Sequence, residues 1–453
     1  RMWSLGVLDN PSVTQEVGRL IGSELRACGV DMVFAPVLDV NIDLENTIIG
    51  ARSFGSDSRL VSRHGIRYID GLMDSGVIPV AKHFPGHGAA NQDSHIEGAV
   101  ATLSENELKK QTFGPFQQAI KKKLPMIMTA HVLYPALDPD KPATRSSAIL
   151  TDLLREKMKF KGVVISDHMD MKSVRNDRSL NEAAVEAFNA GVDMIMLGNS
   201  RSEIVSVVSF FEKAIKEGTI SQERLDDAVR RIIRLKMEYG LFDKKKINVQ
   251  EMTAQLRKAS SLHLADEILS SSIQVLSSSI EPDYYDFKDK TVLIMSSDEG
   301  LSKTMTDFFS DQGAEMRHVS LKKPLSSKKR WQYRSRIMSG KAKNPDQLLS
   351  LIYDDYPVSE KKMKDIYQAM SNVDIIIVSI ETRSQAKAMN QLAQRITIPV
   401  IGLFPGTRFD APFYTAETPN IDTKIVAYNN GNTKKASIRR MLERISAIEV
   451  KSE

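Results

Sequence analysis

Five short apolar segments alternate with segments of helical periodicity in the first half of the chain. Each is hydrophobic at consecutive rather than alternate positions, which is typical of strands buried on both faces of a parallel sheet. The segments lie at 32–40, 78–81, 125–131, 162–167 and 191–197. Between them, Ser104 followed three residues later by Glu107 has the pattern of a capped helix start. This order predicts an α/β fold in which helices cover a parallel sheet.

Four of the five segments end in polar side chains that could carry chemistry, namely Asp39, Lys82 with His83, His131 and Asp167. The carboxyl ends of parallel strands are where (β/α) barrel enzymes hold their active sites. Each residue alone is more often structural, but all of them at the same end of successive strands predict a site there. A closed barrel needs eight strands, so an open, doubly wound sheet is the structural alternative. No Gly-rich phosphate loop follows these segments, which argues against a nucleotide-binding version of that sheet.

A second strand–helix pattern begins after the charged stretch near residue 245. Its apolar runs predict strands at 291–297, 315–320, 373–380, 398–404 and 424–429. This half contains few paired carboxylates or histidines, so we expect it to have a structural role before a catalytic one. The sequence thus predicts two domains, a barrel-type catalytic domain over 1–245 and a smaller three-layer α/β sandwich over 246–453.

The composition argues against several classes of protein. The net charge of +5 does not imply a nucleic-acid partner, and no run of 18 apolar residues indicates a membrane span. Cys28 is the single cysteine, so neither an intrachain disulfide nor a cysteine-based metal site can form.

A loop rich in histidine follows the second apolar segment, and metal binding is one interpretation of it. His83, His87 and His95 could supply three nitrogen ligands. Pro85 and Gly86 separate the first two histidines and prevent the helix that would place them on one face. We therefore predict no metal and no cofactor, and we keep a metal-dependent hydrolase as a minor alternative.

The same loop offers groups for acid–base catalysis. Asp93 and His95 are two residues apart, so in an extended loop the carboxylate can orient the imidazole and raise its basicity. Asp167 ends an apolar segment, where a carboxylate nucleophile could act. The opposing interpretation is that Asp167 caps the next segment while Asp93 accepts hydrogen bonds from loop amides. Spacing alone does not separate the two.

Several motifs follow one another between residues 10 and 242. They are FAPVLDV, IGARSFG, KHFPGHG followed by DSH, MTAH, VVISDHMDM and ERLDDAVRRIIRLKMEYGLF. Together they resemble glycoside hydrolase family 3, and within it the β-N-acetylhexosaminidase branch, which removes N-acetylglucosamine from peptidoglycan fragments. The resemblance implies a (β/α)8 TIM-barrel-type catalytic domain followed by a smaller α/β sandwich domain. The first three strands of the family barrel have no counterpart here, so we expect about five βα units and low activity from this chain alone.

The resemblance also implies roles for individual residues. Asp167 corresponds to the nucleophile, His95 to the acid/base and Asp93 to the partner of His95. The residues expected to bind the sugar or to support the site are Arg52, Lys82, His83, Asp39, His131 and Met171. The chain departs from the family pattern at Ala89 and Ala90, where an Asp-Thr pair is usual, and at His168.

The implied function is that of a retaining exo-β-N-acetylglucosaminidase acting on peptidoglycan-derived muropeptides or related glycans. A β-glucosidase-type hydrolase of the same family is one alternative, and a non-catalytic carbohydrate-binding or wall-associated relative is another. A carbohydrate substrate is the expected partner. By analogy with proteins that act on cell walls, we expect an extracellular or wall-associated location, with a cytoplasmic location as the alternative.

Overall fold

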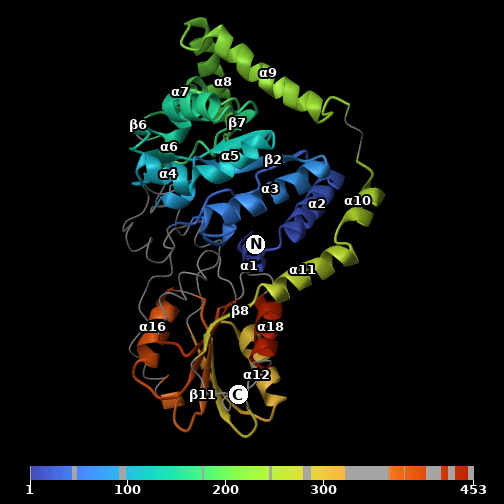
Figure 1. The fold of residues 1–453 in the computed structure, drawn as a ribbon, viewed down its shortest axis with the longest axis vertical. Coiled ribbons are helices and arrows are strands. Elements are labelled where there is room, and N and C mark those ends of the chain that lie inside the picture. Colours follow the sequence, from blue (N-terminus) through green and yellow to red (C-terminus); the bar gives the residue numbers. More distant parts are fainter. Residues whose placement is uncertain are drawn as a thin grey trace. The chain divides into compact units, whose positions relative to one another are not determined.

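The chain forms two compact units, Met2–Leu264 and Ala265–Glu453, each with its own sheet and helices (Figure 1). The computed structural model describes residues 2–42, 48–90, 98–175, 178–243, 247–278, 287–321, 366, 368–381, 383–404, 420–426 and 434–446. The predicted α/β class is confirmed. The assignment of catalysis to 1–245 and of a sandwich to 246–453 stays a prediction.

The sheet of the first unit contains the apolar segments in the order in which they occur along the chain. Its parallel strands are β1 (Met32–Val33), β2 (Ile78–Phe84), β4 (Met126–Thr129) and β7 (Val163–Ile165). Two isolated parallel bridges continue it, one between Val37 and Lys82 and one between Ile165 and Met194. All five predicted segments therefore lie side by side. The strands described in this unit do not close into a barrel.

The first unit also contains helices, of which the last continues into the second unit. They are α1 (Met2–Leu8), α2 (Pro11–Ala27), α3 (Ser58–Asp74), α4 (Glu105–Gln111), α5 (Phe113–Lys121), η4 (Ala148–Lys157, a π-helix), α6 (Lys172–Arg175), α7 (Leu180–Ala190), α8 (Arg201–Lys216), α9 (Gln222–Glu238), α10 (Val249–Gln255) and α11 (Ala259–Ser271). The capping box predicted at Ser104 and Glu107 begins α4 and satisfies amides that the first turn leaves unpaired. None of the described helices combines the length and the apolar composition needed to cross a membrane.

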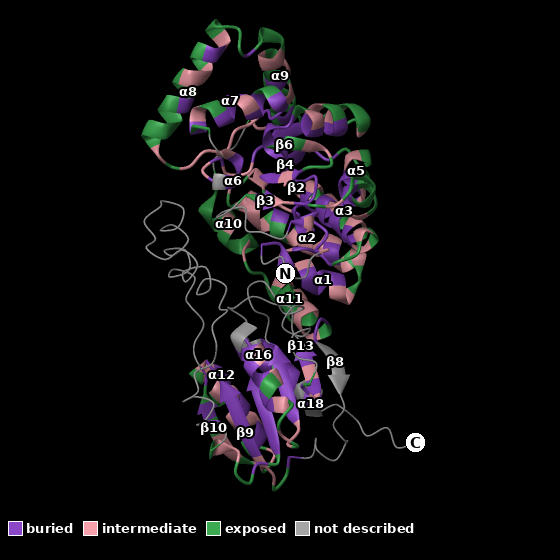
Figure 2. Cartoon of the chain, turned by 90° about the vertical axis from the view of Figure 1, so that its left-hand side faces the viewer, coloured by how far each residue is buried: buried purple, intermediate pink, exposed green. Residues whose placement is uncertain are grey.

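Apolar side chains bury both faces of the central strands, which appear purple in Figure 2. On one face, Phe84 packs edge-on against Phe116 of α5, with ring centroids 5.3 Å apart. On the other face, Val80 and Met128 belong to a cluster that includes Leu235 of α9. Burial on two sides explains why the strand sequences are continuously apolar rather than alternating.

The chain between β2 and β7 also forms a small second sheet that the sequence did not indicate. It consists of β3 (Ala99–Val100), β5 (Val132–Tyr134) and β6 (Asp138–Pro142). The last of these reads DPDKP and has no apolar alternation, so hydropathy could not predict it. It joins the sheet by antiparallel pairing with β5, and η3 (Ala143–Arg145) follows it directly.

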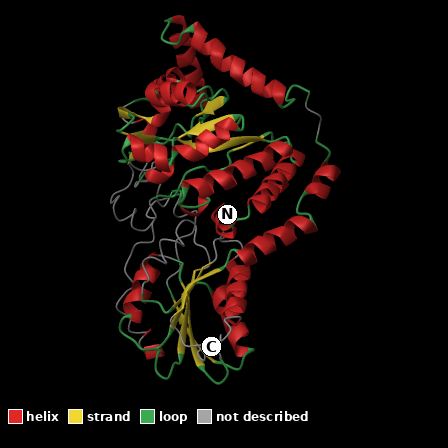
Figure 3. Ribbon diagram, in the orientation of Figure 1, coloured by secondary structure: helices red, strands yellow, loops and turns green. Residues whose placement is uncertain are grey.

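The second unit is a mostly parallel sheet with helices on both faces. The strand order is β10 (Glu315–Ser320), β9 (Thr291–Ser296), β11 (Ile375–Ser379), β12 (Val400–Phe404), β13 (Thr423–Val426) and β8 (Gln274–Ser278). Helices α12 (Glu299–Ser310), α16 (Arg383–Ala393) and α18 (Lys434–Ser446) accompany it (Figure 3). The predicted strands are present, whereas β8 was not predicted and pairs antiparallel with β13.

Candidate active site

The first unit brings most of the predicted site residues to the carboxyl ends of its parallel strands. Asp39 lies two residues beyond the bridge at Val37, and Lys82 and His83 lie within β2. His131 follows β4 by two residues, and Asp167 follows β7 by two. The predicted pair Asp93 and His95 lies outside the described residues.

Asp39 is fully buried and accepts hydrogen bonds from three donors, two on His83 near the end of β2 and one in the loop that follows. Its Oδ2 atom accepts from His83 Nδ1 at 2.7 Å, and its Oδ1 atom accepts from the amides of His83 at 3.1 Å and His87 at 2.7 Å. Backbone pairing sets this contact, because Leu38 N donates to Lys82 O at 2.7 Å. Burial would raise the pKa of Asp39, but its interactions with His83 and His87 hold that pKa below the usual value.

His83 lies between two carboxylates. Its Nδ1–H is directed to Asp39, and its Nε2 atom lies 3.8 Å from Asp167 Oδ2. Burial lowers the pKa of His83 more than the two carboxylates raise it. The neutral ring that follows carries its proton on Nδ1, since Asp39 is an acceptor there. His83 Nε2 therefore offers a lone pair beside Asp167, which can accept a hydrogen bond from a hydroxyl group.

Asp167 keeps an ionised carboxylate in a mostly enclosed position. Its side chain is 22% exposed, and its Oδ1 atom accepts from His168 N at 2.7 Å. Burial would raise the pKa of Asp167, yet His83, His131, the His168 amide and Lys82 together hold it well below the usual value. A carboxylate that stays charged and still reaches solvent is suited to nucleophilic or electrostatic work.

Lys82 supplies the cation of the site. Burial and the charge of Arg52 lower the pKa of Lys82 to about 8, although Asp167 and Asp39 oppose this shift. Its ammonium therefore loses its proton as the pH rises through about 8. Arg52 ends η1 (Gly50–Arg52), where its Nη1 atom donates to Ile48 O at 3.0 Å. The two predicted cations, Lys82 and Arg52, therefore interact electrostatically with each other and with the groups of the site: Lys82 with Asp167 and Arg52 with His83.

His131 and Met171 support the segment that carries Asp167. The Nε2 atom of His131 lies 3.2 Å from His168 O, a carbonyl to which Met171 N also donates at 3.2 Å. The Nδ1 atom of His131 lies 2.7 Å from Thr144 Oγ1. Both predicted residues are almost fully buried, and whether they line the sugar site or only support it stays a prediction.

Thr144 and the close approach of the loop at Gly88 were missed by sequence reasoning. Thr144 lies in η3, where no periodicity or motif marks it. A side-chain carbon at Gly88 would lie 1.9 Å from Val40 O, so only glycine lets the loop pass there. The Lys82–His83 and Phe84–Pro85 peptide bonds of this loop are cis. Ala90, which stands where the family pattern has a polar residue, is completely buried.

Replacing Asp39 by asparagine is expected to lower kcat/KM by about 10²-fold, because an amide facing His83 Nδ1 favours the tautomer with its proton on Nε2. That proton would face Asp167 and remove the acceptor described above. The measurement is kcat/KM with a chromogenic glycoside, together with the unfolding midpoint. Ser53→Ala is the matched control, since Ser53 Oγ donates to the backbone oxygen of Asp39 at 2.6 Å and leaves its carboxylate unchanged. Equal activity of Asp39→Asn and wild type would contradict this role.

In the part of the chain that the structure describes, no three histidine, cysteine, aspartate or glutamate side chains are arranged to hold a metal ion. The groups that do converge are two carboxylates, the imidazole between them and an ammonium at the carboxyl ends of parallel strands. They define the class of α/β proteins that carry a carboxylate-centred site on a parallel sheet.

A comparison with protein families makes the class specific. Residues 1–235 match the family model described as "Glycosyl hydrolase family 3 N terminal domain". The chain belongs to glycosyl hydrolase family 3, which confirms the resemblance in the sequence.

Curated relatives share part of their length with this chain. A beta-hexosaminidase of Nitrosomonas eutropha is 34% identical over 226 residues, which cover 49% of this chain and 64% of the relative. A beta-hexosaminidase of Tolumonas auensis is 39% identical over 194 residues, covering 43% of this chain and 57% of the relative. A Cellulomonas fimi protein named "Beta-N-acetylglucosaminidase/beta-glucosidase" is 30% identical over 267 residues, covering 57% and 47%. The chain thus spans less than two thirds of each.

Solved structures extend the similarity beyond the family match. A glycoside hydrolase family 3 beta-N-acetylglucosaminidase from Paenibacillus sp. FPU-7 superposes with a TM-score of 0.78 and 25% identity, covering 99% of this chain and 80% of that one. A beta-glucoside phosphorylase superposes with a TM-score of 0.77 at 19% identity, covering 99% and 78%. The second likeness supports the fold alone.

Proposed function

We propose that this chain carries the site of a retaining exo-β-N-acetylglucosaminidase in which Asp167 attacks the anomeric carbon. The observation that carries the proposal is the position of Asp167, which follows β7 at the carboxyl end of the sheet, 3.8 Å from His83 Nε2. The His168 amide and the Lys82 ammonium favour the ionised carboxylate even when His83 is neutral, and part of the Asp167 side chain remains exposed. A carboxylate nucleophile needs both properties.

The reaction would be a double displacement with retention at the anomeric carbon. Protonated His95, oriented by Asp93, donates to the glycosidic oxygen as Asp167 forms the glycosyl–enzyme bond. Neutral His95 then takes a proton from water, and the resulting hydroxide equivalent breaks that bond and restores the Asp167 carboxylate. These two roles come from the DSH motif, since both residues lie outside the described part of the chain.

Sugar hydroxyls are the expected ligands of the groups around Asp167. Neutral His83 offers Nε2 as an acceptor, while the Lys82 ammonium and the Arg52 guanidinium offer donors. Donors and acceptors at fixed positions around one carboxylate suit a pyranose ring, in which hydroxyl groups play both parts.

N-acetylglucosamine is the sugar that the relatives favour, because two of them are named beta-hexosaminidase. We extend the proposal to muropeptides derived from peptidoglycan, and with them to an extracellular or wall-associated location. β-Glucosides are the second candidate, since the Cellulomonas relative carries both activities in its name.

The test compares nitrophenyl β-N-acetylglucosaminide, nitrophenyl β-glucoside and a natural disaccharide as substrates of the 453-residue chain. We expect His95→Ala to slow hydrolysis of the disaccharide by about 10² to 10⁴-fold, the usual contribution of a general acid. It should slow the nitrophenyl substrate much less, because that leaving group needs little protonation. The anomer released first, followed by nuclear magnetic resonance, should be the β form.

Turnover above that of an Asp167→Asn variant, even if slow, supports the proposal. Calorimetric binding of N-acetylglucosamine without any turnover would favour a carbohydrate-binding protein instead. Release of the α anomer first would contradict a retaining mechanism.

A further inference from the structure

The sheet of the second unit reverses its direction of growth between β9 and β11. From β9 the chain crosses over through α12 to β10 on one side, and β11 and β12 then lie on the other side. Helix α16 lies on one face of the sheet, while α12 and α18 lie on the opposite face (Figure 1). In such sheets, ligands bind outside the carboxyl ends of the two strands where the order reverses. The carboxyl ends of β9 and β11 are therefore the place to look for a site.

Buried polar side chains gather at that place, and we call them the strand-end cluster. Its members are Ser296, Ser297, Ser379, Glu381 and Gln385, each no more than 4% exposed. Ser297 Oγ donates to Glu381 Oε2 at 3.0 Å and so joins the end of β9 to the end of β11. Glu381 N donates to Gln385 Oε1 at 2.8 Å. The mechanism proposed for the first unit uses none of these groups.

Ser379 is the member whose hydrogen bonding is incomplete. In the parallel pairing of β11 with β9, Ile377 lies opposite Ile294, so two residues further on Ser379 lies opposite Ser296. Residues two apart in a strand point to the same face, so both serines lie on the face of these isoleucines. Ser379 Oγ is fully buried and has no hydrogen-bond partner in the described part of the chain. An unpaired buried hydroxyl costs stability. Its presence where the strand order reverses, at the carboxyl ends of β9 and β11, is therefore explained best by a ligand or another function.

The charges at the strand-end cluster indicate the chemistry of that ligand. Asp298 caps α12 by accepting from Gly300 N at 2.8 Å and from Leu301 N at 3.1 Å. These are the amides that would otherwise bind a phosphate. A second carboxylate, Glu381, lies in the cluster, so an anion is disfavoured. A carboxylate beside hydroxyl groups is suited to a ligand that presents two adjacent O–H donors.

We infer that the strand-end cluster binds a neutral vicinal diol, in which Glu381 accepts from the two hydroxyl groups and Ser379 Oγ completes the contact. Such a diol could belong to a free sugar or to the ribose of a nucleoside. This site belongs to the second unit alone, and it stands whether or not the glycosidase proposal holds.

The test is a methyl nuclear magnetic resonance titration of the full chain with N-acetylglucosamine and, separately, with adenosine. Ile380 lies between Ser379 and Glu381 and reports on the strand-end cluster, while Ile165 of β7 reports on the first unit. We expect a saturable shift of the Ile380 signal whose dissociation constant rises by about 10 to 100-fold in Glu381→Gln, as for loss of a charged hydrogen bond. A shift with N-acetylglucosamine assigns a sugar ligand, and one with adenosine alone assigns a nucleoside.

Two further variants separate binding from structure. Asp374→Asn removes a carboxylate at the opposite end of β11, where Asp374 Oδ2 accepts from Thr291 N at 2.7 Å, and should leave the affinity unchanged. Ser379→Ala should weaken binding without lowering the unfolding temperature, since it removes a hydroxyl that has no hydrogen-bond partner among the described residues. Absence of an Ile380 shift with both compounds would overturn the inference. Equal affinities of wild type, Glu381→Gln and Ser379→Ala would do the same.

Discussion

Asp167→Ala is expected to reduce release of nitrophenol from a nitrophenyl β-N-acetylglucosaminide by about 10³-fold or more, the scale on which enzymes lose activity with a nucleophile. The side chain contributes little to folding, because it is partly exposed and its described hydrogen bond is to the adjacent amide. The variant should therefore unfold at nearly the wild-type temperature. The assay measures kcat/KM and the unfolding midpoint on the same preparation.

Rescue of the variant by azide distinguishes a catalytic nucleophile from a residue that only positions the substrate. In Asp167→Ala, azide can enter the space left by the carboxylate and displace nitrophenolate directly, so the product should be the α-glycosyl azide. Asp170→Asn is the matched control, since its carboxylate lies 3.7 Å from His168 Nδ1 and outside the group that surrounds Asp167. It should keep most of the activity. An Asp167→Ala variant as active as Asp170→Asn would remove Asp167 from the mechanism.

The described part of the candidate site could be predicted because parallel strands follow the order of the chain. Asp39 and His83 are 44 residues apart in the sequence. They lie at the carboxyl ends of two neighbouring parallel strands, so that Asp39 Oδ2 and His83 Nδ1 are only 2.7 Å apart. Asp167 reaches the same edge two strands further on. Continuous hydrophobicity marks such strands clearly, so the polar residue after each was a sound candidate.

Contacts that depend on irregular segments could not be predicted in this way. The Thr144 hydroxyl that meets His131 lies just after β6, a strand with no apolar signal. The antiparallel strand β8 reads QVLSS and lacks the continuous hydrophobicity of β9, β11 and β12. A hydrogen bond between side chains has no sequence period, because it is set by tertiary register rather than by local conformation. The ion cluster at the other end of the sheet illustrates the same limit.

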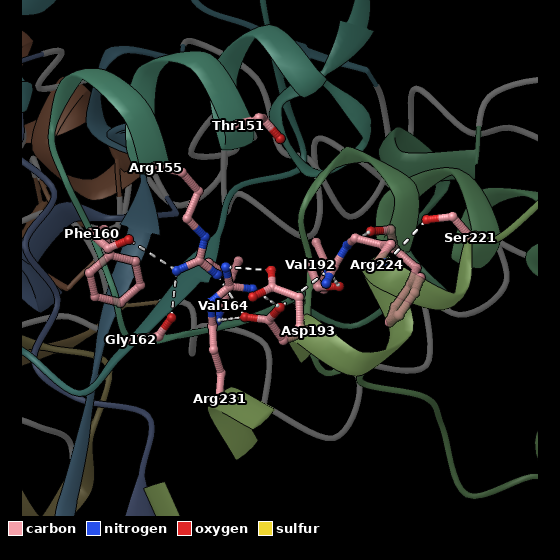
Figure 4. A network of polar contacts seen from close by, with 12 residues as sticks. Thr151, Arg155, Phe160, Gly162, Val164, Val192, Asp193, Ser221, Arg224 and Arg231 are labelled. Carbon is pink, nitrogen blue, oxygen red and sulfur yellow. Dashed lines mark hydrogen bonds and ion pairs between the residues drawn. The ribbon is translucent and has the colours of Figure 1, made fainter. Parts of the chain in front are cut away.

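Asp193 lies at the amino end of the fifth apolar segment and is surrounded by three arginines (Figure 4). Its Oδ2 atom is 2.7 Å from Arg155 Nη2 and accepts from Val164 N at 2.9 Å. Its Oδ1 atom lies 3.2 Å from Arg224 Nη2 and 3.1 Å from Arg231 Nη1. The carboxylate itself has no exposed surface. The buried Asp193 carboxylate thus connects Arg155 of η4 and two arginines of α9 to the backbone of β7 at Val164.

Asp193→Asn is expected to lower the free energy of unfolding of the first unit by about 3 to 5 kcal/mol, the cost of leaving buried charges without their partner. Burial lowers the pKa of Arg155 to about 10, with Asp193 the main opposing influence. In the variant, Arg155 and Arg224 would lose their ion-pair partner, while Arg231 would keep Asp227. Urea unfolding followed by a probe in the first unit measures the loss. Asp227→Asn is the matched control.

Asp227 pairs with the same Arg231 at 2.5 Å, but its side chain is 39% exposed. Its removal should cost at most about 1 kcal/mol because water screens that ion pair. Since Asp193 lies at the end of the sheet opposite Asp167, the Asp193 variant should keep the activity of its folded fraction at low temperature, whereas Asp167→Ala should keep stability and lose activity. This reciprocal result would follow from a sheet that binds substrate at the carboxyl ends of its strands and is held together at their amino ends. Equal stabilities of the Asp193 and Asp227 variants would show that the buried cluster does not stabilise the unit.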